Sequence, residues 1–143
     1  MTQKFIKAVT EKLRERGYKL TGPRLAVIDY LAREKRHPGL QKIYKGILVE
    51  HPGIGIATVY RTIDLLIAVG VLRELNLRNS QLRYELNYAD HHHYLICTSC
   101  GKVNEFDNCN FQLIAGELEE QTHFKIEEHT LEAYGLCAHC LHD

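Results

Sequence analysis

The sequence predicts an α+β fold in two modules, a helical N-terminal module that ends in a β-hairpin and a smaller C-terminal α/β module. Apolar residues change from helical spacing to strand-like alternation near residue 75. The charge divides in the same way, since residues 1–86 hold 16 Lys and Arg against 8 Asp and Glu, whereas residues 87–143 hold 2 against 10. All five cysteines and seven of the nine histidines lie from His91 onward. We therefore expect one domain over residues 1–86 and a second over residues 87–143.

Composition narrows the class of protein. The chain has 143 residues, of which 45% are hydrophobic and 25% charged, which is typical of a folded globular protein. No stretch approaches the roughly 20 consecutive apolar residues that span a bilayer. The N-terminus lacks the apolar core of a signal peptide, so we expect a cytoplasmic protein. No HExxH pattern or isolated general base points to an enzyme.

Four helices are expected in the first module. Apolar residues from Phe5 to Leu13 recur at helical spacing, and Gly17 ends that helix. Thr21 is a suitable N-cap for the second helix, because Pro23 then lies in the first turn, where a missing N–H does no harm. The helices are expected over residues 3–16, from 22 to the break at 37–39, from 40 to the break at 51–53, and over 57–70.

A β-hairpin should follow these helices. Leu75 and Leu77, and later Leu82, Tyr84 and Leu86, alternate with polar residues on either side of a turn at residues 78–81. Short helices followed by a basic hairpin are typical of a winged helix-turn-helix, whose fourth helix would enter the major groove of double-stranded DNA. The start of that helix offers Thr58, Tyr60, Arg61 and Thr62. A helical domain with a solvated basic face is the alternative, and Tyr60 taken alone fits packing as well as DNA contact.

Two CxxC pairs give the strongest signal in the chain. Cys97 and Cys100 form one pair, Cys137 and Cys140 the other, with 36 residues between them. Four thiolates on two tight turns make a closed tetrahedral zinc site, which holds a fold together and does no chemistry. Two disulfides or a redox CxxC are the competing interpretations, but no feature indicates an oxidising compartment or a βαβ unit. Cys109 is left over, and we expect it to be a small buried or surface residue.

A histidine cluster lies directly before the first pair. In a strand, His91 and His93 would face one side of residues 90–94, and His92 and Tyr94 the other, so that two metal sites are conceivable. Other candidate ligands are His37, Glu85, Glu105 and His129. Imidazoles and carboxylates without a thiolate suit Fe(II), Mn(II), Zn(II) or Ni(II). The alternative is a solvated run of histidines.

Together these motifs resemble the ferric uptake regulator family. The matching segments are Thr21-x-Pro23-Arg24, His37-Pro38, Ala57-Thr58-Val59-Tyr60-Arg61, the His cluster, Cys-x-x-Cys-Gly-Lys and the final Tyr-Gly-x-Cys-x-x-Cys. The resemblance covers essentially the whole chain. It implies a metal-responsive bacterial repressor that binds inverted-repeat operators as a homodimer, with an N-terminal winged helix and a C-terminal α/β dimerisation domain.

The resemblance also implies four sets of residues. The structural zinc would be bound by Cys97, Cys100, Cys137 and Cys140. The regulatory metal at the hinge between domains would be bound by His37, Glu85, Glu105 and either His92 with Tyr94 or, after a one-residue bulge, His91 with His93. A second site in the dimerisation domain corresponds to His91, His93, His129 and Gln112, where a carboxylate is usual. DNA contacts would come from Lys19, Arg24, Thr58, Tyr60 and Arg61.

The identity of the regulatory metal follows from family analogy. Zinc sensors of this family tend to have a cysteine in the hinge site, and none lies near residues 78–86. Peroxide sensors tend to have aspartates at the positions of Glu85 and Glu105. Glutamate at both positions favours Fe2+, with Mn2+ or Zn2+ as alternatives. Tyr94 departs from the family pattern, which has histidine there.

Overall fold

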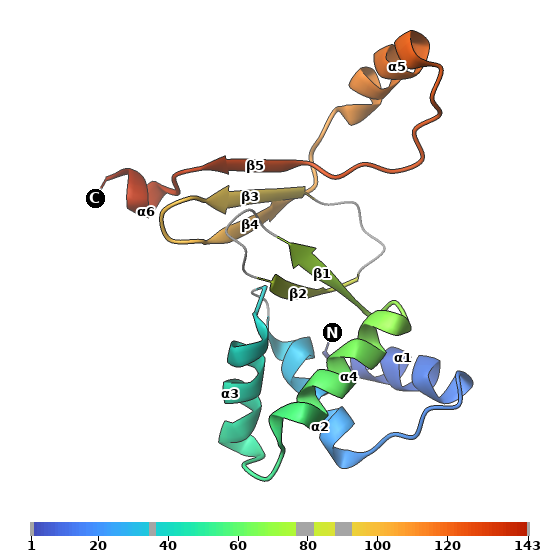
Figure 1. The fold of residues 1–143 in the computed structure, drawn as a ribbon, viewed down its shortest axis with the longest axis vertical. Helices are drawn as coiled ribbons and strands as arrows, with labels where there is room; N and C mark the ends of the chain where they lie inside the picture. Colours follow the sequence, from blue (N-terminus) through green and yellow to red (C-terminus); the bar gives the residue numbers. More distant parts are fainter. Residues whose placement is uncertain (1, 35–36, 77–81, 88–92, 143) are drawn as a thin grey trace. The chain divides into compact units, whose positions relative to one another are not determined.

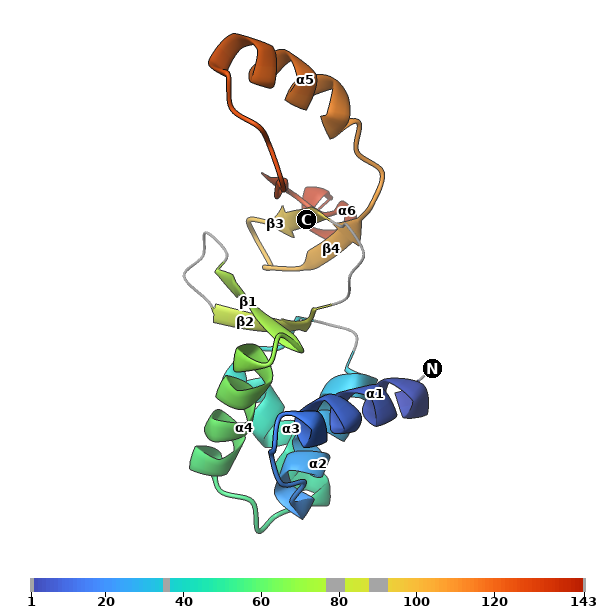
Figure 2. The same ribbon diagram turned by 90° about the vertical axis from the view of Figure 1, so that its right-hand side faces the viewer.

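The computed structural model describes residues 2–34, 37–76, 82–87 and 93–142, and Figures 1 and 2 show the fold in two views. The chain divides into two compact units, residues 1–88 and 89–143. Each unit is described separately below. Among the described residues, no helix combines the length and the apolar character that a membrane crossing requires.

The first unit is built on four helices, α1 (Thr2–Glu15), α2 (Gly22–Arg33), α3 (Leu40–Glu50) and α4 (Ile56–Ala68). The sequence signals for their ends hold. Thr21 caps α2, since its hydroxyl accepts a hydrogen bond from the backbone N–H of Arg24. Helix α2 packs against α1, α3 and α4, so that it forms the centre of the unit.

A two-stranded antiparallel hairpin completes this unit. It consists of β1 (Leu72–Asn76) and β2 (Leu82–Leu86), and Leu72 pairs with Leu86. The expected turn at residues 78–81 lies outside the described residues. Leu72 and Tyr84 join the helical core, which buries apolar side chains from all four helices. That core contains Val9, Leu13, Val27, Ile28, Leu31, Ile43, Ile47, Val59, Ile63, Leu66, Val69 and Val71.

The second unit is a small sheet with two helices. Its strands are β3 (His93–Cys97), β4 (Val103–Phe106) and β5 (Glu132–Gly135), in the order β4-β3-β5. The central strand β3 pairs antiparallel with β4 and parallel with β5. Helix α5 (Phe111–Thr122) lies beyond the end of the sheet, and none of its residues is buried (Figures 1 and 2). The short helix α6 (Ala138–Leu141) follows β5.

The expected alternation of the hairpin is wrong in β2. Leu82 is 40% exposed, whereas the adjacent residues Tyr84 and Glu85 are both buried. A buried carboxylate next to a buried tyrosine breaks the simple pattern of one apolar and one polar face. The reason is a partner for Glu85 from outside the hairpin, which is part of the site described below.

Candidate metal centres and nucleic-acid interface

The start of α4 presents polar side chains to solvent. Tyr60 is 47% exposed and Arg61 is exposed, while Thr58 is half-buried. The expectation that Thr62 is offered on the same surface is wrong. Its side chain is only 2% exposed, and its hydroxyl donates to the Thr58 carbonyl at 2.8 Å. Its hydroxyl is therefore satisfied inside the helix. Tyr60, Arg61 and part of Thr58 remain accessible to a ligand.

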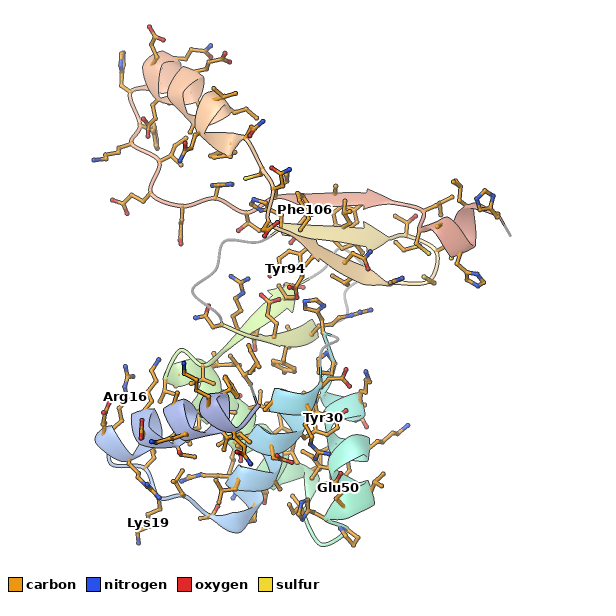
Figure 3. The ribbon with its side chains drawn as sticks, turned by 180° about the vertical axis from the view of Figure 1, so that it is seen from behind. Arg16, Lys19, Tyr30, Glu50, Tyr94 and Phe106 are labelled. Carbon is orange, nitrogen blue, oxygen red and sulfur yellow. The ribbon has the colours of Figure 1, made fainter. Side chains whose placement is uncertain are left out.

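A second basic element lies between α1 and α2. Lys19 is exposed and extends away from the helices in Figure 3. Arg24 is half-buried, and its Nη1 donates to the carbonyl of Lys19. This bond holds the connecting segment against the first turn of α2. Lys19 thus has a defined backbone position and a side chain that is accessible to an anion such as a phosphate.

A buried cluster of charged and polar side chains joins the hairpin to the segment after α2. The backbone N–H of Tyr84 donates to the Pro38 carbonyl at 3.0 Å, and this bond brings His37, the residue before Pro38, next to β2. His37 Nε2 then lies 3.1 Å from Glu85 Oε2, and Arg73 Nε donates to Glu85 Oε1. Both His37 and Glu85 are at least nine-tenths buried. An imidazole and a carboxylate, two of the family-implied ligands, thus face each other within the first unit.

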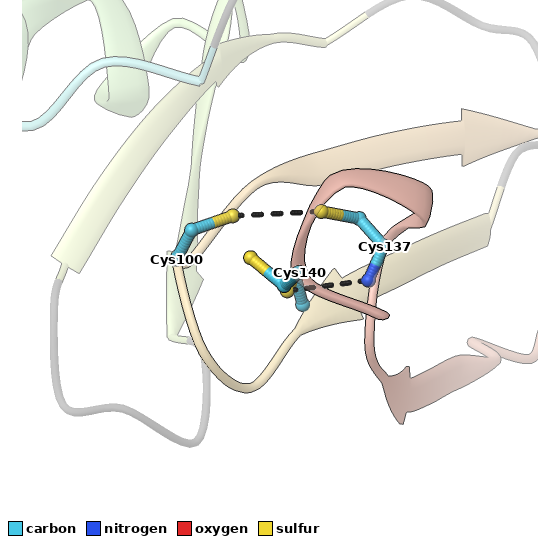
Figure 4. A group of neighbouring side chains, drawn as sticks. Cys100, Cys137 and Cys140 are labelled. Carbon is cyan, nitrogen blue, oxygen red and sulfur yellow. Dashed lines mark hydrogen bonds between the residues drawn. The ribbon is translucent and has the colours of Figure 1, made fainter. Parts of the chain in front are cut away.

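The four cysteines of the two CxxC pairs converge in the second unit, as Figure 4 shows for three of them. Each pair forms a tight turn. In the first turn the N–H of Gly101 donates to the Cys97 carbonyl at 3.0 Å, and Gly101 has a φ of +72°, which favours glycine. The second pair follows β5, whose last residue, Gly135, is in register with Cys97.

The geometry of these sulfurs fits a tetrahedral ion. All four Sγ atoms lie within 4.8 Å of one another, and those of Cys100 and Cys137 are 3.8 Å apart. Two thiolates bound at about 2.3 Å to one tetrahedral zinc would be roughly 3.8 Å apart. The observed separation therefore matches the size of a zinc ion and exceeds that of a disulfide bond, about 2.05 Å.

The surroundings of this cluster lower the pKa of two of its cysteines and raise that of a third. Backbone hydrogen bonds, first from Cys100 and then from Cys137, lower the pKa of Cys97 to about 6. Backbone hydrogen bonding from Cys140 also lowers the pKa of Cys137. The pKa of Cys140 is raised to about 11: its hydrogen bond with Ser99 lowers it, but the contacts with neighbouring cysteine sulfurs raise it and prevail. The lowered pKa of Cys97 favours its thiolate form, which is the form that binds a metal.

A second cluster in this unit contains two histidines and the cysteine that the sequence left over. His93 Nε2 lies 2.9 Å from Cys109 Sγ, which lies 3.4 Å from His129 Nε2. The three ligand atoms all lie within 4.8 Å of one another. Sequence reasoning missed Cys109, because it belongs to no motif and lies 16 residues after His93 and 20 before His129.

The remaining predicted ligands have different surroundings. His91 and His92 lie outside the described residues. Tyr94 is 1% exposed and pairs in register with Glu105, which is exposed on β4. Gln112 is exposed on α5.

The fold and these clusters define a class of protein, a winged-helix DNA-binding protein with a C-terminal metal-ligating domain. The sequence model of the ferric uptake regulator family matches residues 15–134. The chain therefore belongs to the ferric uptake regulator family. It is a metal-responsive DNA-binding repressor of that family.

Three known proteins illustrate the relationship. The chain is 32% identical over 130 residues to the ferric uptake regulation protein of Neisseria gonorrhoeae, covering 90% of each chain. It is 31% identical over 128 residues to the peroxide-responsive repressor of Staphylococcus aureus, covering 90% of this chain and 86% of that one. The solved structure of a ferric uptake regulator from Francisella tularensis with iron is 27% identical, with a TM-score of 0.79, covering 87% of this chain and 96% of that one.

Proposed function

We propose that the chain is an iron-responsive repressor whose regulatory metal binds at the hinge between its two domains, residues 1–86 and 87–143. The observation that carries this proposal is the buried contact of 3.1 Å between His37 and Glu85. Imidazole nitrogen and carboxylate oxygen without a thiolate suit Fe(II) better than a soft ion. Arg73 offsets the charge of the carboxylate, which lowers the cost of burying Glu85.

The remaining hinge ligands come from the resemblance. Glu105 and His92 of the second domain would complete the set, with Tyr94 in the place of the usual histidine. His93 is a weaker candidate for this site, because its Nε2 faces Cys109 and its Nδ1 accepts a hydrogen bond from the Leu131 N–H. Ligands from both domains would favour one arrangement of the DNA-binding heads. A 100-fold change in DNA affinity requires a coupling free energy of only about 2.7 kcal/mol.

The two other metal sites of the proposal lie in the second domain. Cys97, Cys100, Cys137 and Cys140 would bind a structural zinc, for which the sulfur spacing and the low pKa of Cys97 are the support. With all four cysteine thiolates on this ion, no position is left open, so the zinc stabilises the fold. A further metal site would use His91, His93 and His129. We do not expect catalytic turnover from this domain.

The homodimer is supported by the apolar surface of the second domain. Helix α5 carries Leu113, Ile114 and Leu118, which are 74%, 54% and 40% exposed. Phe124 in the following loop is 75% exposed. Solvent-exposed apolar side chains gathered on one helix are typical of an interface. We therefore propose that α5 and the residues after it pair with a second copy, and that the dimer reads an inverted-repeat operator.

The DNA contacts of the proposal are on the first domain. From α4, Tyr60 and Arg61 would contact base edges or phosphates, with Thr58 beside them. Near the start of α2, Lys19 and Arg24 would contact the sugar-phosphate backbone of the DNA. Residues 1–86 carry eight more basic than acidic side chains, 16 against 8. This excess supports an electrostatic contribution to binding that weakens with salt.

The test is anaerobic operator binding by protein that keeps its four-thiolate zinc after chelator treatment, titrated with Fe(II), Mn(II), Zn(II) and Ni(II). Tight binding restored by Fe(II) near micromolar concentration is the expected result. Binding that ignores every added metal would contradict the hinge as the switch, and Tyr94→His would then test whether the missing imidazole is the cause.

A peroxide-responsive repressor is the rival within the family, given the 31% identity to the Staphylococcus aureus protein. The same iron-loaded sample, exposed to hydrogen peroxide, distinguishes the two by mass spectrometry of its tryptic peptides. We expect no rapid addition of oxygen to a histidine. Stoichiometric oxidation of a hinge histidine, with loss of operator binding, would favour the rival.

A further inference from the structure

His93 is the buried centre of the cluster of His93, Cys109 and His129. It is 0% exposed, and both of its ring nitrogens have partners. The backbone N–H of Leu131 donates to His93 Nδ1 at 3.1 Å, so that the proton of the neutral ring is on Nε2. Nε2 lies 2.9 Å from Cys109 Sγ. This N–H therefore donates to the sulfur, and the hydrogen bond holds the two side chains together.

His129 approaches the same sulfur from the chain before β5. Its Nε2 lies 3.4 Å from Cys109 Sγ, and its ring stacks on Phe111 with centroids 3.6 Å apart and planes inclined by 14°. The rings of His93 and Phe106 are tilted, with centroids 5.3 Å apart. Two aromatic rings thus fix both imidazoles and give the cluster apolar walls. Fixed ring orientations and limited solvent access are features of a site whose ligands are held in place before an ion binds.

We propose that His93 Nε2, Cys109 Sγ and His129 Nε2 bind a divalent ion as a His2Cys site, and that the thiolate makes zinc(II) its preferred occupant. This inference deepens the proposed function, since it replaces the family-implied Gln112 with Cys109 in the second metal site. Gln112 is an exposed amide, which is a poor ligand for zinc, whereas Cys109 lies between both histidines. A thiolate also disfavours Mn(II), which prefers oxygen ligands.

The dimensions fit a zinc ion after a small adjustment. Zn–S and Zn–N bonds of about 2.3 and 2.05 Å place tetrahedral ligand atoms roughly 3.5 Å apart. The distance from Cys109 to His129 is already 3.4 Å, while that from Cys109 to His93 is 2.9 Å and must widen. On binding, the Cys109 thiol loses its proton to solvent and the sulfur forms the new bond to zinc. The His93 proton moves from Nε2 to Nδ1, so the Leu131 amide must give up its hydrogen bond to that nitrogen.

The experiment uses Co(II) as a spectroscopic probe in the full-length protein with zinc retained in the four-cysteine site, verified by elemental analysis. A thiolate-to-cobalt charge-transfer band should appear with the wild type and vanish in Cys109→Ser, and zinc should remove it by competition. The matched control is Gln112→Ala, which should keep the band. Loss of a direct ligand should weaken zinc binding at this site by at least about tenfold.

Three outcomes overturn the proposal: no charge-transfer band in the wild type, an equal band in Cys109→Ser, or a loss of the band in Gln112→Ala with Cys109 intact. A ¹⁵N spectrum supplies a second measurement, because the Leu131 amide resonance should shift on zinc binding, and an unmoved resonance removes His93 from the ligand set. Operator binding is recorded in parallel. Metal-dependent operator binding without the band contradicts this inference alone, whereas the band without metal-dependent operator binding contradicts the proposed function alone.

Discussion

Gly46→Ala should destabilise the first unit, although alanine is the better helix former. Gly46 lies in the middle of α3, facing Tyr30 of α2. A Cβ at this position would lie 2.2, 2.5 and 2.7 Å from Cε2, Cζ and Oη of Tyr30. The tyrosine ring cannot swing away without loss, because its hydroxyl donates one hydrogen bond that is shared between Glu34 Oε2, at 3.3 Å, and the Lys42 carbonyl, at 3.4 Å. Figure 3 labels Tyr30 among the helices of this unit.

The magnitude follows from three opposing contributions. Replacing glycine in a helix interior gains about 1 kcal/mol. Overpacking a contact of this kind costs about 1–3 kcal/mol. Loss of this shared hydrogen bond of Tyr30 adds about 1 kcal/mol. The expected net loss in the free energy of unfolding is therefore about 1–3 kcal/mol, and each kcal/mol lowers the Tm of a unit of this size by roughly 4–8 °C.

Urea denaturation followed by circular dichroism measures this change, and two further variants isolate the cause. Gly116→Ala in α5 makes the same chemical change where the added Cβ would meet no atom within 4 Å beyond its chain neighbours and its own helix backbone, and helical spacing places it away from Ile114 and Leu118, so it should stabilise its unit by about 1 kcal/mol. In a Tyr30→Leu background, Gly46→Ala should no longer destabilise. If Gly46→Ala stabilises the wild type as much as Gly116→Ala does, the steric argument is refuted.

Four further predictions concern metal and DNA. The wild type should bind its operator about 100-fold more tightly with metal than without it, and His37→Ala should lose this difference while size-exclusion chromatography still shows a dimer. A metal titration of operator binding that is the same in His37→Ala as in the wild type would contradict the ligand role of His37. Cys97→Ser should release the zinc or unfold the second unit, and full zinc content in a stable dimer would show that the assignment is wrong. Protons compete with zinc for the four thiolates, and the lowered pKa of Cys97, about 6, favours its thiolate form at neutral pH, so zinc should stay bound at neutral pH and be released to a chelator only as the pH falls; chelator-detected release centred above pH 7 argues against this. Operator affinity should fall with salt at a slope of about −0.9 per phosphate contact, and a flat salt dependence would exclude Lys19 and Arg61 as phosphate ligands.

Local signals predicted the first unit well because its elements begin and end on residues that act locally. The Thr21 cap and the break at His51 need only neighbours within four residues. Two local expectations are wrong, one for Thr62 and one for Glu85. Thr62 is buried because it lies three residues after Val59 and four before Leu66, on the apolar face of α4, and its hydroxyl is satisfied there by the Thr58 carbonyl. Glu85 is buried because Arg73 from the opposite strand and His37 from the preceding loop supply its partners.

The four-cysteine cluster and the histidine–cysteine cluster also show what local sequence signals can and cannot predict. Each CxxC pair is a complete local motif, so its sequence spacing alone predicted how two thiolates would meet. Cys109 has no such partner nearby in sequence. It reaches His93 and His129 only because β3 is the central strand, with β4 on one side, leading to Cys109, and β5 on the other, reached from His129. The order β4-β3-β5 therefore creates a ligand set that no spacing rule contains, and it lets a single thiol determine which ion the site selects.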